Sequence, residues 1–277
     1  MPKINKQKPI KLTQRDIDIL WKLSLKGYRF LTCRHLFPLY FPSESACQRR
    51  MSQLRKAGLV QRCFTPVIYE KQKREVVYTL ARKGAKELAR ALNISPKGLA
   101  GSAKFSPLFL EHSLRISNFM CSLEAALRKA PAKLVSWISE KQLRSLKLKV
   151  SNPEQYGEKI PIIPDGFFSI KMGERIENFF LEADRGTMPI PKIRKKMMGY
   201  IQLYRRGLHK EVFGLPHFRV LVITTNEKRR DLMMQELRDI GYCLNMFLFA
   251  IWQDIKPQSI LEKIWLKCRG EEIYLLK

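Results

Sequence analysis

The stretch SESACQRRMSQLRKAGLV, residues 43–60, decides the fold of the first third of the chain. At about 100° per residue, Cys47, Met51 and Leu54 fall on one face of a helix, and the opposite face is polar and cationic. Ser43 is a typical helix N-cap, and a glycine follows the last apolar position, where a helix would end. The stretch therefore predicts an amphipathic helix with no acidic side chain beyond its first turn.

The flanking sequence predicts the remaining elements of a small domain. Helical spacing indicates two helices earlier in the chain, and two β-like stretches, 59–64 and 76–80, follow the quoted helix. A further helix over 81–92 closes the unit. Three helices, a hairpin and a supporting helix are the order of a winged helix-turn-helix, which we predict for residues 1–92.

The outer face of the quoted helix and the hairpin tip have the chemistry of a DNA-binding surface. Residues 1–92 hold 21 basic and 6 acidic side chains. Arg and Gln suit base edges in a major groove, whereas Lys and Ser suit phosphates. The alternative is a solvated charged face, which is the role of most charged helices. The predicted contact residues are Ser45, Gln48, Arg49, Arg50, Ser52, Gln53 and Lys56 on the helix, and Lys71, Lys73 and Arg74 at the hairpin tip.

The whole chain is strongly basic. Its 277 residues carry a formal net charge of +27, which favours double-stranded DNA as a partner and leaves RNA as an alternative. The most apolar run, 246–252, is far shorter than the roughly 20 residues of a membrane-spanning helix. No secretory signal is recognisable, so we expect a cytoplasmic protein without a membrane partner. Six scattered cysteines without a CxxC pair predict free thiols and not a zinc site.

The rest of the chain predicts a second, larger domain. Residues 93–107 are rich in Gly, Ser and Pro and predict a linker. Residues 108–277 follow the order α-β-β-β-α-β-α-β, which implies a mixed sheet with helices on both faces. The predicted fold class is α/β (α+β), with the winged helix-turn-helix followed by an α/β domain.

Acidic side chains in the second domain stand out against the basic background. The fragments PDG (164–166) and LEADRGT (181–187) contain these acids, and the basic fragment KIRKKMMGY (192–200) follows them. Strand alternation puts Glu182 and Asp184 on one face, and Asp165 begins the preceding strand. Converging carboxylates repel and need protons or a divalent cation. Mg²⁺ or Mn²⁺ on such oxygens could activate water against a phosphodiester.

These fragments resemble those of known proteins. The acid after proline and the glutamate on the next strand resemble the PD-(D/E)xK nuclease superfamily, and about residues 10–225 resemble the plasmid replication-relaxation protein family. The residues that carry the family resemblance are LRKAGLV (54–60), VYTLARKG (77–84), WISE (137–140), PDG, LEADRGT and a lysine four residues before Tyr200. The resemblance implies a restriction-endonuclease-like domain with a mixed central sheet. It also implies a role in the replication or DNA relaxation of plasmids and other mobile elements.

The catalytic pattern departs from the nuclease motif at one position. The motif places lysine two residues after Glu182, where this chain has Asp184. Lys196, on the following helix beside its buried stripe, is the predicted substitute. The predicted catalytic set is then Asp165, Glu182, Asp184 and Lys196, with the metal on Asp165 and Glu182, and Glu140 is a candidate fourth acid.

Two functions stay open from the sequence. The first is a DNA-binding accessory protein with a metal-dependent nickase or endonuclease site. The second is a catalytically inactive winged-helix regulator or replication-complex scaffold, in which Asp184 lies in a turn and pairs with Arg185 or caps the next helix. Replication or mobilisation proteins and a second copy of the chain are further candidate partners.

Overall fold

The computed structural model describes residues 10–64, 75–101 and 105–276, which form two compact units. Unit 1 comprises residues 1–121 and unit 2 comprises residues 122–277. The predicted hairpin-tip residues Lys71, Lys73 and Arg74 lie outside the described residues. No helix among the described residues combines the length and the apolar character needed to cross a membrane.

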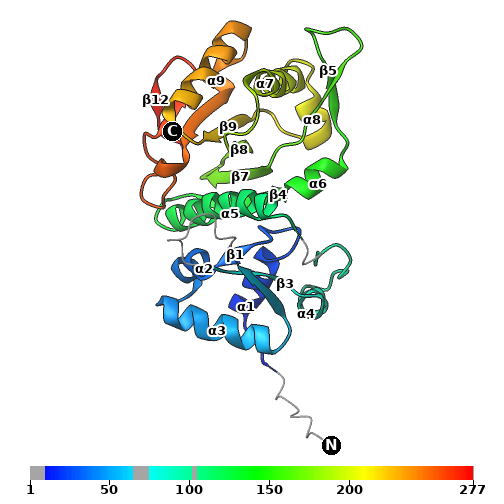
Figure 1. Cartoon of the computed structure of the whole chain (residues 1–277), viewed down its shortest axis with the longest axis vertical. Helices are drawn as coiled ribbons and strands as arrows, with labels where there is room; N and C mark the ends of the chain where they lie inside the picture. Colours follow the sequence, from blue (N-terminus) through cyan, green and yellow to red (C-terminus); the bar gives the residue numbers. More distant parts are fainter. Residues whose placement is uncertain (1–9, 65–74, 102–104, 277) are drawn as a thin grey trace, which may run out of the picture. The chain divides into compact units, whose positions relative to one another are not determined.

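Unit 1 contains the predicted helices and hairpin (Figure 1). Its elements are α1 (Gln14–Lys22), β1 (Leu31–Thr32), α2 (Cys33–Tyr40), α3 (Glu44–Lys56), β2 (Val60–Phe64), β3 (Val76–Leu80) and α4 (Arg82–Leu92), and α5 (Pro107–Leu127) begins in this unit. The three strands form an antiparallel sheet in the order β1-β3-β2. This is the element order expected of a winged helix-turn-helix.

Helix α3 follows the predicted pattern of caps and buried positions. The Ser43 hydroxyl accepts a hydrogen bond from the Ala46 backbone N–H at 3.2 Å, which satisfies one of the free donors at the helix start. Cys47, Met51 and Leu54 are fully buried. The amphipathic helix predicted from residues 43–60 is therefore confirmed.

The segment predicted as a linker packs within unit 1. Leu99 is fully buried, and its carbonyl accepts the Leu25 N–H at 2.8 Å. Most of α5, as far as Cys121, also belongs to this unit, and its Leu110 packs in a core cluster with Phe30 and Val77. The division of the chain consequently falls after Cys121 and not at the predicted residue 108.

Unit 2 is built on a mixed seven-stranded sheet, as the predicted α/β class requires (Figure 1). Its strands are β4 (Lys133–Ser139), β7 (Gly166–Met172), β8 (Arg175–Ala183), β9 (Arg219–Thr224), β10 (Phe247–Ile251), β11 (Trp265–Lys267) and β12 (Glu272–Ile273). The order is β12-β11-β10-β9-β8-β7-β4. Strands β8, β9 and β10 are parallel to one another, and the other pairs are antiparallel.

Helices α7 (Ile190–Arg205), α8 (Leu208–Phe213) and α9 (Glu227–Ile240) pack on one face of this sheet. Phe180 from β8 lies in the same core cluster as Met197 from α7 and Leu237 from α9, so the predicted alternation along β8 is confirmed. The remaining short elements are α6 (Glu140–Ser145), β5 (Lys149–Ser151), β6 (Lys159–Pro161) and the 3₁₀ turns η1 (Leu244–Met246) and η2 (Trp252–Asp254).

Candidate functional site

Three acidic residues form a row at one end of the unit 2 sheet. Glu140 directly follows β4, Asp165 directly precedes β7, and Glu182 lies near the end of β8. The strand register pairs Ser139, the last residue of β4, with Gly166, the first residue of β7. Gly166 is in turn paired with Leu181 of β8. One position further along, Glu140, Asp165 and Glu182 are therefore neighbours. A carboxylate oxygen of Glu140 lies within 4.8 Å of one of Asp165.

Backbone hydrogen bonds hold Asp165 against β8. Its N–H donates to the Leu181 carbonyl at 3.0 Å, and its carboxylate accepts the Ala183 N–H at 2.7 Å. The following Gly166 is required by close packing, because a Cβ there would lie 2.2 Å from the Trp137 ring. The PDG fragment thus combines an acid fixed to β8 with a glycine that lets β4 approach β7.

Glu182 is buried and bound at both of its carboxylate oxygens. The Lys196 ammonium donates to Oε2, and the Tyr200 hydroxyl donates to Oε1. The two donors are four residues apart on α7, and this spacing places them on one helix face. Only 8% of the Glu182 surface is exposed.

Burial and neighbouring charges set the protonation of this cluster. Burial, together with the Asp165 carboxylate, raises the pKa of Glu182 to about 7, against the opposing effect of the Lys196 ammonium. Burial alone would lower the pKa of Lys196, but the carboxylates of Glu182, Asp165 and Glu140 raise it. Lys196 is therefore a half-buried cation surrounded by carboxylates, next to a glutamate that can exchange a proton near neutral pH.

Asp184 has partners of its own. The Arg229 guanidinium donates to both of its carboxylate oxygens, at 2.6 and 2.9 Å, and the Thr224 hydroxyl donates at 2.6 Å. The Gly186 N–H also donates to Asp184, at 3.1 Å, so the aspartate closes a turn. The structure therefore uses Asp184 to fasten the end of β8 to β9 and α9, and its charged partner is Arg229 and not Arg185.

Glu140 and Asp165 are the candidate cation ligands of the acid row, and each already accepts one hydrogen bond, from Arg144 and from the Ala183 N–H respectively. Mg²⁺–oxygen distances are about 2.0–2.1 Å, so two oxygens that share one ion lie at most about 4.2 Å apart. Oxygens up to 4.8 Å apart would have to move closer to bind one ion together. Glu182, the other predicted ligand, already accepts hydrogen bonds from Lys196 and Tyr200 at its two oxygens. Glu140, the candidate fourth acid, thus gains a role beside Asp165.

In unit 1, α3 presents most of its predicted contact residues at the surface. The exposed residues are Ser45, Gln48, Arg49, Gln53 and Lys56, whereas Arg50 and Ser52 are half-buried. Within the described residues no ion pair joins Arg49 or Lys56 to an acid. These two cations therefore remain available to a ligand.

Arg50 has a structural partner inside unit 1. Its guanidinium donates to the two oxygens of Asp16 at 2.9 and 2.6 Å, and Asp16 is fully buried. Burial alone would raise the pKa of Asp16, but hydrogen bonds from Arg50 and Thr13 lower it. Arg50, one of the predicted DNA contacts, is therefore engaged in joining α3 to α1.

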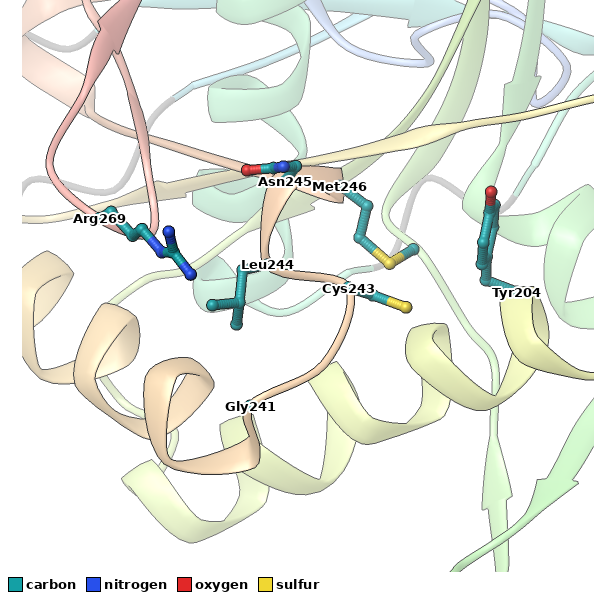
Figure 2. Close-up of a pocket in the computed structure, with 7 residues that line it drawn as sticks. All are labelled: Tyr204, Gly241, Cys243, Leu244, Asn245, Met246 and Arg269. Carbon is teal, nitrogen blue, oxygen red and sulfur yellow. The ribbon is translucent and has the colours of Figure 1, made fainter.

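A separate pocket of about 410 Å³ opens in unit 2 beside η1 and the end of α9 (Figure 2). Its lining residues are Tyr204, Gly241, Cys243, Leu244, Asn245, Met246 and Arg269. None of them was predicted from the sequence, and the lining includes no carboxylate. The acid row and this pocket are therefore different sites.

Comparison with known proteins decides the family. The family model described as Replication-relaxation matches residues 23–215, well over half of the chain. The chain belongs to the replication-relaxation family. The family match includes α3, the acid row and Lys196, whereas Arg229, the partner of Asp184, lies beyond its end.

Other comparisons with this replication-relaxation protein are weak. No curated protein matches the sequence. Among solved structures, a crystal structure of Bacillus subtilis PadR in complex with operator DNA is similar at 16% identity, covering 52% of this chain and 80% of that chain. Its TM-score is 0.22, so no conclusion about this replication-relaxation protein is drawn from it.

Sequence reasoning missed three functional partners in the replication-relaxation protein. Tyr200 was not predicted as a partner of Glu182, although the Lys-x-x-x-Tyr spacing places Tyr200 and Lys196 on one face of the helix. Asp16 lies 34 residues from its partner Arg50 in the sequence, and Arg229 lies 45 residues from its partner Asp184. No local sequence pattern indicates a partner that lies so far away along the chain.

Proposed function

We propose that this replication-relaxation protein is a DNA-binding accessory protein of a plasmid or other mobile element, acting in replication or DNA relaxation. Unit 1 would dock on duplex DNA as a winged helix-turn-helix, with α3 in the major groove. The support is the exposed face of α3, where Arg49 and Lys56 lie without an acidic partner among the described residues. Such cations bind phosphates or base edges.

We further propose that unit 2 is a PD-(D/E)xK-like nuclease domain that nicks or cleaves DNA. The observation that carries this proposal is the half-buried Lys196 ammonium among three carboxylates at one end of the sheet. The carboxylates offset the cost of removing this charge from water, and Glu140 and Asp165 beside it are candidate ligands for a cation. The order of β4, β7, β8, α7 and β9 also follows the predicted order of the second domain, with α6, β5 and β6 inserted between β4 and β7.

Each residue then has a chemical role. Mg²⁺ or Mn²⁺, held by Glu140 and Asp165, would supply Lewis acidity and lower the pKa of a bound water. The Lys196 ammonium would offset the negative charge that develops on the scissile phosphate. Glu182 can accept a proton near neutral pH, because its pKa is about 7. Tyr200 fixes the orientation of that carboxylate through Oε1.

A second function is favoured by the contacts of Glu182 and Asp184. Both oxygens of each carboxylate are satisfied within the protein, as expected of structural acids. On this alternative, unit 2 is an inactive nuclease fold, and the protein acts as a regulator or as a scaffold of a replication complex.

Nicking of supercoiled plasmid separates the two functions. The full chain is incubated with plasmid in Mg²⁺ or Mn²⁺, with EDTA as the metal-free control. An active site predicts open circles that disappear in EDTA and in the Glu182→Ala and Asp165→Asn variants. Glu174→Gln is the matched control, because the Glu174 side chain is fully exposed on the β7–β8 turn. Metal-independent products, or no products on any DNA, would favour the scaffold.

A further inference from the structure

The pocket beside η1 is formed where the chain turns sharply after α9. The helix ends at Gly241, whose φ of 79° lies in the left-handed region that favours glycine. Cys243 also has a positive φ, of 53°, so the chain turns again before it enters η1 and β10. These turns leave a space of about 410 Å³ beside the end of α7. Pockets of about 300–1,000 Å³ are the size that binds small ligands.

One wall of the pocket is a tyrosine ring that its neighbours hold in place. The Tyr204 ring stacks on the buried His209 imidazole, with 4.9 Å between the ring centroids and 13° between the planes. An edge-to-face contact with Phe218, at 5.9 Å, supports the ring from a second direction. Tyr204 nevertheless keeps 41% of its surface exposed. An aromatic ring that is supported on one face and exposed elsewhere can stack on a planar ligand.

The opposite wall of the pocket contains a cation. Figure 2 shows the Arg269 side chain at one side of the pocket and the Tyr204 ring at the other. Arg269 is exposed, and no carboxylate within the described ranges forms an ion pair with it. Its backbone is held against α9, because the Arg238 guanidinium donates to the Cys268 carbonyl at 2.8 Å. An arginine in this position suits a phosphate group.

The surface between the two walls is apolar, with one amide at its edge. Leu244 is half-buried and Met246 is buried, so both offer apolar contacts. The Asn245 side chain is exposed and makes no hydrogen bond to the part of the chain that the structure describes. An amide both donates and accepts, as the edge of a nucleobase does. An aromatic wall, an apolar floor, a free amide and a cation together match a base that carries a phosphate.

The same chemistry continues beside the pocket. Arg205 directly follows Tyr204, and its guanidinium lies over the Tyr242 ring, 5.0 Å from the centroid. Tyr242 lies between two lining residues, Gly241 and Cys243, and 55% of its surface is exposed. A second aromatic ring and a second cation therefore lie next to the pocket, where the neighbouring nucleotide of a strand could bind.

We propose that this pocket binds a nucleotide, with its base stacked on Tyr204 and its phosphate on Arg269. An unpaired DNA strand and a free nucleotide both supply this chemistry, and the adjoining Arg205 and Tyr242 favour the strand. The lining residues all belong to unit 2, and none of them is part of the acid row. The inference therefore goes beyond the proposed function and holds whether or not unit 2 cleaves DNA.

Fluorescence anisotropy with a labelled tetradeoxyadenylate strand tests the stacking. The full chain would carry Arg49→Ala/Lys56→Ala, so that α3 contributes little to binding. Tyr204→Leu should weaken binding by about tenfold, because a stacked base is lost, whereas Tyr204→Phe keeps the ring and should bind within about twofold. Tyr156→Leu is the matched control, since Tyr156 is fully exposed and lies outside the pocket. Equal affinities of the Tyr204→Leu and Tyr156→Leu chains would overturn the proposal.

Charge variants at the surface test the phosphate contact without disturbing the core. Arg269→Gln should weaken binding of the same strand by about fivefold at low salt and flatten its salt dependence, because one phosphate contact is lost. Lys228→Gln is the matched control, because Lys228 is equally exposed but lies at the opposite end of α9, about 20 Å from Gly241. A loss in Lys228→Gln as large as in Arg269→Gln would reduce the binding to general attraction by a basic surface.

Competition identifies the source of the nucleotide. Unlabelled strand should displace the labelled strand at a concentration about tenfold or more below that of deoxyadenosine monophosphate, because each further nucleotide adds contacts. Equal competition would assign the pocket to a free nucleotide, and equal displacement by inorganic phosphate would overturn the proposal. A wild-type chain that binds the strand but no duplex would contradict the proposed function and leave this inference standing.

Discussion

Helices α3 and α7 both contain neighbouring cations, and the pairs Arg49–Arg50 and Lys195–Lys196 are used in opposite ways. On α3, Arg49 is exposed and Arg50 is paired with the buried Asp16. On α7, Lys196 is paired with the buried Glu182, and its neighbour Lys195 pairs with Glu158 nearer the surface. On our account the functional cation of α3 is the one without an acidic partner, and the functional cation of α7 is the one paired with a buried acid.

The contrast follows from what each proposed ligand needs. A DNA backbone is bound by cations that remain in water and exchange counterions for phosphates, so these side chains must stay at the surface. Charge that develops during a reaction is stabilised best by a fixed cation in a site of low dielectric constant. A buried carboxylate partner therefore marks a structural arginine in unit 1 and a candidate catalytic lysine in unit 2.

The largest expected effect is on the α7 pair. We predict that Lys196→Met lowers plasmid nicking by about 10³-fold, because the cation next to the scissile phosphate is lost. Lys195→Met should retain activity within about twofold, because Lys195 makes only a half-exposed ion pair with Glu158. Rates would be measured under single-turnover conditions, with circular dichroism as the folding check. Equal losses in the two variants would remove the distinction between the two lysines.

A change in the PDG glycine should disturb the acid row without altering any charge. Gly166→Ala places a Cβ where the Trp137 ring lies, and we expect a loss of about 2–3 kcal/mol in the free energy of unfolding. Because β4 must move away from β7, Glu140 should separate from Asp165, and metal-dependent nicking should fall as well. Urea denaturation and the plasmid assay measure the two effects. A fully stable and active variant would contradict the packing described for Trp137.

We expect the two arginines of α3 to contribute to different properties, Arg50 to stability and Arg49 to DNA binding. Arg50→Ala leaves Asp16 buried without its cation and should lower the free energy of unfolding by about 2 kcal/mol. Arg49→Ala should change it by less than about 0.5 kcal/mol, because Arg49 is exposed. Chemical denaturation of both variants measures the difference. An unstable Arg49→Ala protein would show that Arg49 has a structural role as well.

The contribution of Arg50 should also depend on pH. The folded-state pKa of Asp16 is lowered from 3.8, so its ionised form stabilises the fold above that pH. As the pH falls through the folded-state pKa, Asp16 is protonated and this stabilisation is lost. The stability difference between the wild type and Arg50→Ala should therefore shrink in acid, which denaturation curves at several pH values would measure. A constant difference would assign the effect of Arg50 to packing alone.

Local patterns predicted more of this structure than distant partners. The caps and buried stripe of α3 follow from nearest-neighbour geometry, and strand alternation correctly placed Glu182 on the face of α7. The β5–β6 hairpin was not predicted, because its two strands are only three residues long. The partners of Arg50 and Asp184 also escaped prediction, since they depend on contacts between residues far apart in the sequence. The sequence thus showed which charged residues are present, but it did not show which partner each of them binds.

The central claim is that the exposed face of α3 binds the DNA backbone, and the salt dependence of duplex binding tests it most directly. The affinity of the full chain should fall steeply with salt, and the slope of log Kobs against log [salt] should decrease by about two in Arg49→Ala/Lys56→Ala. A wild-type chain that binds no duplex at low salt, or a double variant with the wild-type slope, would contradict the claim.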